Sequence, residues 1–140
     1  MADNKQAVER VIRTFNNHDA EAVVQLYTED ATYMLPGEPD PLRGRDAIKE
    51  SYEMFFRAFP DMSSEILRTM ASGEHAFAEC VVRGTHTGPL KTPEGEVEPT
   101  DKKIEFGIAF VCKVTPDGLI AEDWTYFDSA VMMSQLGLAD

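Results

Sequence analysis

Three acidic side chains crowd one aromatic segment near the C-terminus, within DGLIAEDWTYFDSAVMMSQLGL. Glu122, Asp123 and Asp128 lie close to Trp124 and Tyr126 in the sequence. A carboxyl group buried among aromatic rings loses hydration, so its pKa rises and it can exchange a proton near neutral pH. The segment therefore indicates acid–base chemistry, provided that one of the three acids faces a cavity.

The alternation of side chains along a β-strand separates these acids. In a regular strand, Trp124 and Asp128 share one face and Asp123 points to the other. Glu122 shares the face of Asp128 but lies roughly 20 Å away along the strand. Trp124 is the only tryptophan of the chain and favours a covered environment. We therefore predict that Asp128 faces the cavity as general acid or base. Glu122 is too distant to act with it as a close carboxylate pair, unless a bulge lies between the two.

Asp128 also has a second interpretation. It directly precedes SAVMMSQLGL, which is predicted to be helical, and Asp is a favoured N-cap residue. From the residues alone, capping and catalysis both stay open for this side chain.

His86, in VVRGTHTGPL, is the second catalytic candidate. In a strand it shares a face with Ala78, Cys80 and Val82, which are small or apolar and therefore predicted to point inward. His86 would then reach the cavity mouth as an acid, a base or a hydrogen-bond donor. A structural or half-exposed histidine is the alternative.

Other candidates would bind a ligand rather than react with it. Tyr33 could offer its hydroxyl to a ligand carbonyl, or could be a core aromatic residue. Arg45, in LRGRDAI, could bind an anionic group or form a surface salt bridge. The complete set predicted to contact substrate is Trp124, Tyr126, Tyr33, Phe56, Phe110 and Arg45.

No metal or cofactor site is expected. Cys80 and Cys112 belong to no CxxC motif or Cys/His cluster, so we expect buried free thiols. The glycine-containing stretches lack the spacing of a phosphate-binding loop.

Length and charge restrict the remaining classes. The 140 residues fit one domain, 1–140. The net charge of −12 argues against binding to nucleic acid or to an anionic membrane surface. The sequence has no membrane-spanning apolar run and no signal peptide at its start, so we expect a cytoplasmic protein.

The pattern of elements predicts an α+β fold. Apolar periodicity predicts helices and alternation predicts strands. The predicted helices cover 4–16, 19–27 and 46–59, and the predicted strands cover 30–35, 63–71, 75–87, 102–114 and 119–128. A curved antiparallel or mixed sheet wrapped around the N-terminal helices would bury their apolar stripes and enclose an apolar pocket.

Several stretches together resemble a known family. FNNHDAEAVVQLYTEDATYMLPG and PLRGRDAIKESYEMFFRAFPD are similar to the nuclear transport factor 2-like (cystatin-like) α+β cone fold. RGTHTGPL, followed by DGLIAEDWTYFD and SQLGL, closely resembles the SnoaL-like polyketide cyclase and ester cyclase group. The resemblance covers nearly the whole chain.

The resemblance implies an intramolecular aldol cyclisation without metal or cofactor. The catalytic aspartate of that group follows the tryptophan of the last strand, a position that Asp128 matches. The assisting histidine of the penultimate strand has no counterpart in EFGIAFVCKV, where Val111 or Cys112 stands; His86 could substitute for it.

The leading functional hypothesis is a cofactor-free cyclase that acts on a small, largely apolar carbonyl compound such as a polyketide-like ester. The alternatives are a ketosteroid-isomerase-like or epoxide-hydrolase-like reaction in the same pocket, or a non-catalytic ligand-binding or dimerisation module. A homodimer through the outer face of the sheet is expected, because a large curved sheet seldom leaves one face bare.

Overall fold

The computed structural model describes residues 4–92 and 95–138, and it has the predicted α+β architecture. The helices are α1 (Asn4–Phe15), α2 (Ala20–Val24), α3 (Arg45–Ala58) and α4 (Ser129–Gln135). The strands are β1 (Tyr27–Met34), β2 (Leu42–Arg43), β3 (Ser63–Ser72), β4 (His75–Thr85), β5 (Leu90–Thr92), β6 (Gly95–Val97), β7 (Lys103–Val114) and β8 (Ile120–Tyr126).

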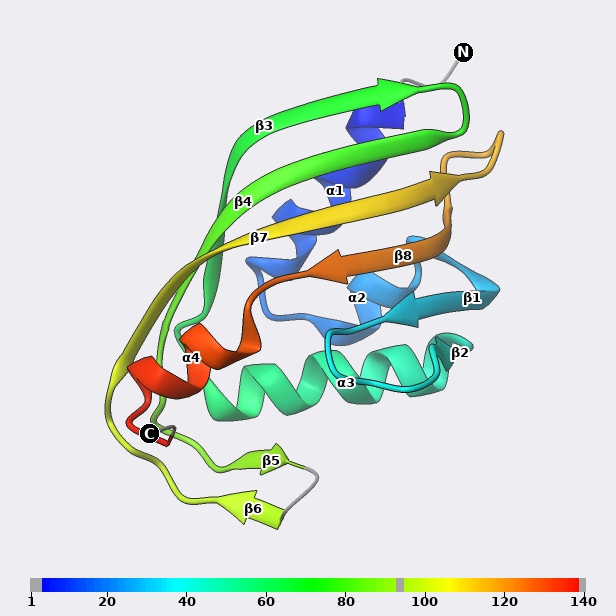
Figure 1. Cartoon of the computed structure of the whole chain (residues 1–140). Helices are drawn as coiled ribbons and strands as arrows, with labels where there is room; N and C mark the ends of the chain where they lie inside the picture. The colour runs from blue at the N-terminus through cyan, green and yellow to red at the C-terminus, as the bar shows by residue number, and fades with distance from the viewer. Residues whose placement is uncertain (1–3, 93–94, 139–140) are drawn as a thin grey trace.

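Six of the strands in the described residues form one curved sheet in the order β2-β1-β8-β7-β4-β3 (Figure 1). The pairing of β1 with β8 is parallel and the other pairings in this sheet are antiparallel, so the sheet is mixed. The long strands β3, β4 and β7 bend along their length and wrap around the helices. The curved mixed sheet predicted from the sequence is confirmed.

Helices α1, α2 and α3 lie on the inner face of this sheet (Figure 1). Their apolar stripes face inward: Val8 and Ile12 of α1 and Ile48 of α3 are buried. The side chain of Asp19 accepts a hydrogen bond from the Ala22 amide at 3.0 Å and caps α2, as the sequence predicts. The core therefore lies between the helices and the sheet.

A bulge at the start of β8 changes which side chains face the core. Ile120 pairs with Val114, but Glu122 pairs with Lys113, so Ala121 is an extra residue on the β8 side. After this bulge, Asp123 and Thr125 point inward and are buried, whereas Trp124 and Tyr126 point outward. The prediction that Trp124 faces the cavity and Asp123 faces away is therefore wrong.

One further difference concerns residues 88–100, which lie between the predicted strands 75–87 and 102–114 and were not themselves predicted to form strands. Leu90 pairs with Val97 and Lys91 with Glu96, so β5 and β6 form a separate antiparallel pair. This pair lies beyond the end of the main sheet (Figure 1).

Candidate active site

Asp123 is a carboxyl group inside the protein, with only 2 % of its surface exposed. Tyr27 donates a hydrogen bond from its hydroxyl to Oδ2 at 2.6 Å, and Thr125 donates from its hydroxyl to Oδ1 at 2.9 Å. Burial raises the pKa of Asp123 to about 6, although both hydrogen bonds act to lower it. Asp123 can therefore gain or lose a proton near neutral pH.

Three tyrosines surround this carboxyl group. The hydroxyls of Tyr27 and Tyr52 lie 2.7 Å apart, and the rings of Tyr33 and Tyr52 meet edge to face with centroids 5.5 Å apart. Burial, followed by the neighbouring charge of Asp123, raises the pKa of Tyr27 and Tyr33 above the ordinary value. Burial is also the main cause of the raised pKa of Tyr52. The three hydroxyls therefore keep their protons and act as hydrogen-bond donors.

An apolar cavity of about 50 Å³, partly open to solvent, lies next to this cluster. The wall is made by Val11, Ile12, Phe15, Tyr33, Leu35, Tyr52, Phe55, Met62, Ser64, Val82, Phe106, Ile108, Phe110, Thr125, Phe127 and Met132. None of these residues is charged, and four of them carry a side-chain hydroxyl. Asp123 and Tyr27 are not part of the wall, so the carboxyl group lies behind it.

Hydrogen bonds connect the carboxyl group to the cavity along two routes. Thr125 contacts Asp123 and also lines the cavity. On the other route, Tyr27 contacts Asp123 and Tyr52, and Tyr52 lines the cavity. A group within the protein can therefore exchange protons with a ligand through hydroxyls that touch that ligand.

The protonation state of Asp123 sets the direction of these hydrogen bonds. Ionised Asp123 accepts from Tyr27, so Tyr52 can donate to the Tyr27 oxygen and then points its proton away from the cavity. Protonated Asp123 can instead donate to Tyr27, which donates to Tyr52. The proton of Tyr52 is then available to an oxygen atom in the cavity.

Asp128 lies outside this network. Its Oδ1 accepts hydrogen bonds from the amides of Ala130 and Val131 at 3.0 and 3.3 Å, which makes it the N-cap of α4. The face of β8 that carries Trp124 and Tyr126 is the outer one, so the prediction that Asp128 shares a cavity-facing surface with them is wrong. Trp124 and Tyr126 are exposed on the outer face.

His86 also lies away from the cavity wall, so its predicted place at the cavity mouth is wrong. It is fully buried, and its Nδ1 accepts a hydrogen bond from the Thr100 amide at 3.2 Å. Its ring packs against Phe59 with centroids 5.4 Å apart. The prediction from strand alternation that the His86 side chain points inward is correct. The histidine lies away from the cavity, however, and its backbone connects the end of β4 to residues 100–102.

The other predicted binding residues are divided between the cavity and its surroundings. Tyr33 and Phe110 line the cavity. Phe56 packs against Phe15 behind the wall, with ring centroids 5.1 Å apart. Arg45 donates two hydrogen bonds to the carbonyl of Tyr27, at 2.7 and 3.0 Å, and so holds the backbone at the start of β1. Whether any of them binds a ligand stays a prediction.

The sequence reasoning missed Asp123, Tyr27, Tyr52 and Thr125 as a group. Tyr27 and Tyr52 lie within the predicted helices 19–27 and 46–59, and apolar periodicity alone does not show which groups their hydroxyls contact. The sequence feature that allows Asp123 to point inward is the extra residue Ala121, between Ile120 and Asp123. It can be recognised only when β8 is aligned with its neighbouring strands.

Among residues 4–92 and 95–138, no group of three or more His, Cys, Asp or Glu side chains is arranged to hold a metal ion. Within the same ranges, no helix has the length and apolar character needed to cross a membrane.

Comparison with known proteins identifies the family. The model of the SnoaL-like polyketide cyclase family matches residues 5–136, so the chain belongs to this family. No protein with a curated description matches it in sequence.

Solved structures agree with this assignment. The chain is similar to IdmH, a candidate polyketide cyclase from Streptomyces antibioticus, with 28% identity over 97% of this chain and 99% of that one and a TM-score of 0.80. A candidate polyketide cyclase from Bacillus cereus is 26% identical over 96% of this chain and 80% of that one, with a TM-score of 0.74. The chain also shares its fold with SalBIII, an epoxide hydrolase/cyclase-like enzyme in pyran ring formation of salinomycin. The two are 22% identical over 94% of this chain and 92% of that one, with a TM-score of 0.75.

Proposed function

We propose that this chain is a cofactor-free cyclase that closes a ring in a small, largely apolar carbonyl compound by intramolecular aldol addition. In this proposal Asp123 holds the catalytic proton. The sequence-based prediction gave that role to Asp128, whose side chain caps α4. Family membership and the 28% identity to IdmH support the reaction class.

The reaction starts from the enol form of a substrate that carries a 1,3-dicarbonyl group and an aldehyde. The C=C electron pair attacks the aldehyde carbon and forms the new C–C bond. The aldehyde π pair moves to its oxygen, which takes a proton from Tyr52. Tyr27 then returns a proton to Tyr52, and Asp123 returns one to Tyr27.

The second route restores the carboxyl group. As the enol becomes a ketone again, its O–H proton passes to Thr125, whose own proton passes to Asp123. The product is an isomer of the substrate, so no co-reactant is consumed. The apolar wall excludes water and folds the chain of the substrate, which lowers the entropic cost of ring closure.

One observation carries this proposal: the continuous contact from Asp123 through Tyr27 to Tyr52 at the cavity wall, with distances of 2.6 and 2.7 Å. Tyr27 is not part of the wall, so it can be changed without altering the surface that the substrate touches.

The Tyr27→Phe variant tests this connection. It should lower the rate constant of ring closure by roughly 100-fold, a typical contribution of a positioned acid or base, and should leave KM unchanged. The substrates are a panel of methyl 3-oxo-esters that carry a terminal aldehyde, and product is measured by mass spectrometry.

Phe56→Leu is the control, because Phe56 also packs behind the wall but has no hydroxyl. Full turnover by Tyr27→Phe, or an equal loss in Phe56→Leu, would contradict the proposal. Carbonyl-directed isomerisation would use the same carboxyl and tyrosines. Products that keep an open chain and a shifted double bond would favour that reaction.

We also propose that the outer face of the sheet forms a homodimer. Trp124, Val111, Phe77 and Met70 pair across β8, β7, β4 and β3 and make one apolar row. Charged pairs flank this row on both sides, with Arg68–Glu79 at 2.6 Å and Lys113–Glu122 at 3.9 Å. Self-complementary apolar and charged rows suit a second copy related by a two-fold axis.

A further inference from the structure

Ser64 is the polar residue of the cavity wall that lies far from Asp123 in the sheet. It is on β3, at the sheet edge, whereas Thr125 is on β8. Three strand spacings separate these two strands, roughly 14 Å across the sheet. The cavity therefore has hydroxyls at two separate places.

The Ser64 hydroxyl is buried without a hydrogen-bond partner among the described residues. Only 5 % of the residue is exposed, and it lines the cavity. Burial raises the pKa of the neighbouring Cys80 thiol, while the Ser64 side chain acts to lower it; a thiol is only a weak acceptor for the Ser64 hydroxyl. Leaving a buried hydroxyl without a partner is unfavourable, so its presence in an apolar wall calls for an explanation.

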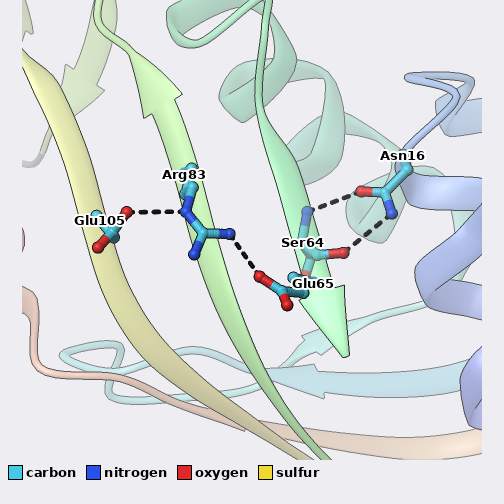
Figure 2. A network of polar contacts seen from close by, with 5 residues as sticks. All are labelled: Asn16, Ser64, Glu65, Arg83 and Glu105. Atoms are coloured by element: carbon cyan, nitrogen blue, oxygen red, sulfur yellow. Dashed lines mark hydrogen bonds and ion pairs between the residues drawn. The ribbon is translucent and has the colours of Figure 1, made fainter. Parts of the chain in front are cut away.

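The backbone of Ser64 is held on both sides. The Asn16 side chain accepts a hydrogen bond from the Ser64 amide at 2.8 Å and donates one to the Ser64 carbonyl at 3.0 Å (Figure 2). The next residue, Glu65, points outward and pairs with Arg83 at 2.8 Å. This arrangement fixes the alternation of β3 and keeps the Ser64 side chain directed inward.

We propose that Ser64 is a substrate-binding residue that hydrogen-bonds a further oxygen of the substrate, far from the aldehyde oxygen at Tyr52 and the enol oxygen at Thr125. This inference rests on the proposed function and defines its substrate class further. The substrate is a largely apolar molecule that carries one oxygen function beyond those of its reacting 1,3-dicarbonyl and aldehyde groups.

The test compares two probes that differ by one hydroxyl, 2-decanone and 10-hydroxy-2-decanone, whose dissociation constants are measured by calorimetry. The wild-type chain should bind the hydroxyketone roughly two- to tenfold more tightly, as expected for one added hydrogen bond. In Ser64→Ala and in the nearly isosteric Ser64→Cys, the hydroxyketone should lose this advantage. Ser51→Ala, a buried serine of α3 outside the cavity wall, should keep it.

A hydroxyketone advantage retained in either folded Ser64 variant would overturn the proposal. So would its absence in the wild-type chain, a failure of the hydroxyketone to bind the wild-type chain saturably, or its loss in Ser51→Ala. The calorimetric assay measures binding and requires no turnover. A chain without ring-closure activity would therefore contradict the proposed function, while the comparison of the two probes would still test the role of Ser64.

Discussion

At the scale of single residues, the environment of Asp123 determines the chemistry available. The carboxyl group is buried, has two hydroxyl donors and is paired with no cation among the residues that the structure describes. Burial therefore outweighs the hydrogen bonds and raises its pKa to about 6. Such a group reduces stability at neutral pH while it supplies a usable proton.

The effect on stability has a definite sign. The unfolded chain ionises Asp123 near the ordinary value of 3.8, while the folded chain keeps the proton up to about 6. Protonated Asp123 contributes its full stabilisation of the folded chain below pH 3.8. This contribution, roughly 3 kcal/mol, is lost as the pH rises to about 6. Asp123→Asn has no carboxyl group to titrate at this position. The free energy of unfolding of this variant minus that of the wild type should therefore be larger at pH 7.5 than at pH 4.

Urea denaturation at both pH values measures this difference. Asp117→Asn, which changes an exposed acid of the β7–β8 turn, is the matched control. A constant difference between Asp123→Asn and the wild type across this pH range would show that Asp123 titrates normally.

At the scale of elements, the bulge in β8 and the N-cap of α4 determine the positions of Asp123 and Asp128. The extra residue Ala121 sends Asp123 inward, and the end of β8 leaves Asp128 to begin α4. A capping role for Asp128 was one of the two interpretations open from the sequence.

Removing this cap should affect stability. Asp128→Ala should lower the free energy of unfolding by about 1 kcal/mol, because the amides of Ala130 and Val131 lose their acceptor. Asp128→Ser restores a capping oxygen and should recover most of that loss. Chemical denaturation of the two variants checks this, and equal stability of Asp128→Ala and the wild type would argue against the cap.

The sequence predicts the longer helices and strands better than it predicts the candidate site. Long periodic stripes such as Val8 to Phe15 and long alternating runs such as β4 predicted the helices α1, α2 and α3 and the longer strands, because burial dictates those patterns; the short strands β2, β5 and β6 were missed. The site was predicted poorly because Trp124 was taken to mark the inner face of β8, whereas it is exposed on the outer face. Alternation shows which side chains share a face but not which face is buried, and the bulge at Ala121, which lets both Ile120 and Asp123 point inward, shows only in the pairing of β8 with β7.

At the scale of the whole molecule, the two faces of the sheet have different uses. The inner face encloses the cavity, and the outer face carries the apolar row of Trp124, Val111, Phe77 and Met70. Phe77 is 41% exposed in the single chain, so a second copy would cover it.

Phe77→Glu should convert a dimer into a monomer, because it places a charge in the centre of the apolar row. Val131→Glu is the matched control: Val131 is 39% exposed but lies on α4. Sedimentation velocity should give twice the chain mass for the wild type and Val131→Glu, and the single mass for Phe77→Glu. A monomeric wild type would contradict the proposed interface.

The most direct test compares two isosteric variants in the same ring-closure assay on the aldehyde-bearing 3-oxo-esters. Asparagine at either position keeps the size of aspartate and one acceptor oxygen but cannot exchange a proton, and it caps a helix as well. Asp123→Asn should lower the rate constant by roughly 100-fold or more, and Asp128→Asn should change it less than about threefold. Loss of turnover in Asp128→Asn together with full turnover in Asp123→Asn would contradict the assignment of the catalytic proton to Asp123.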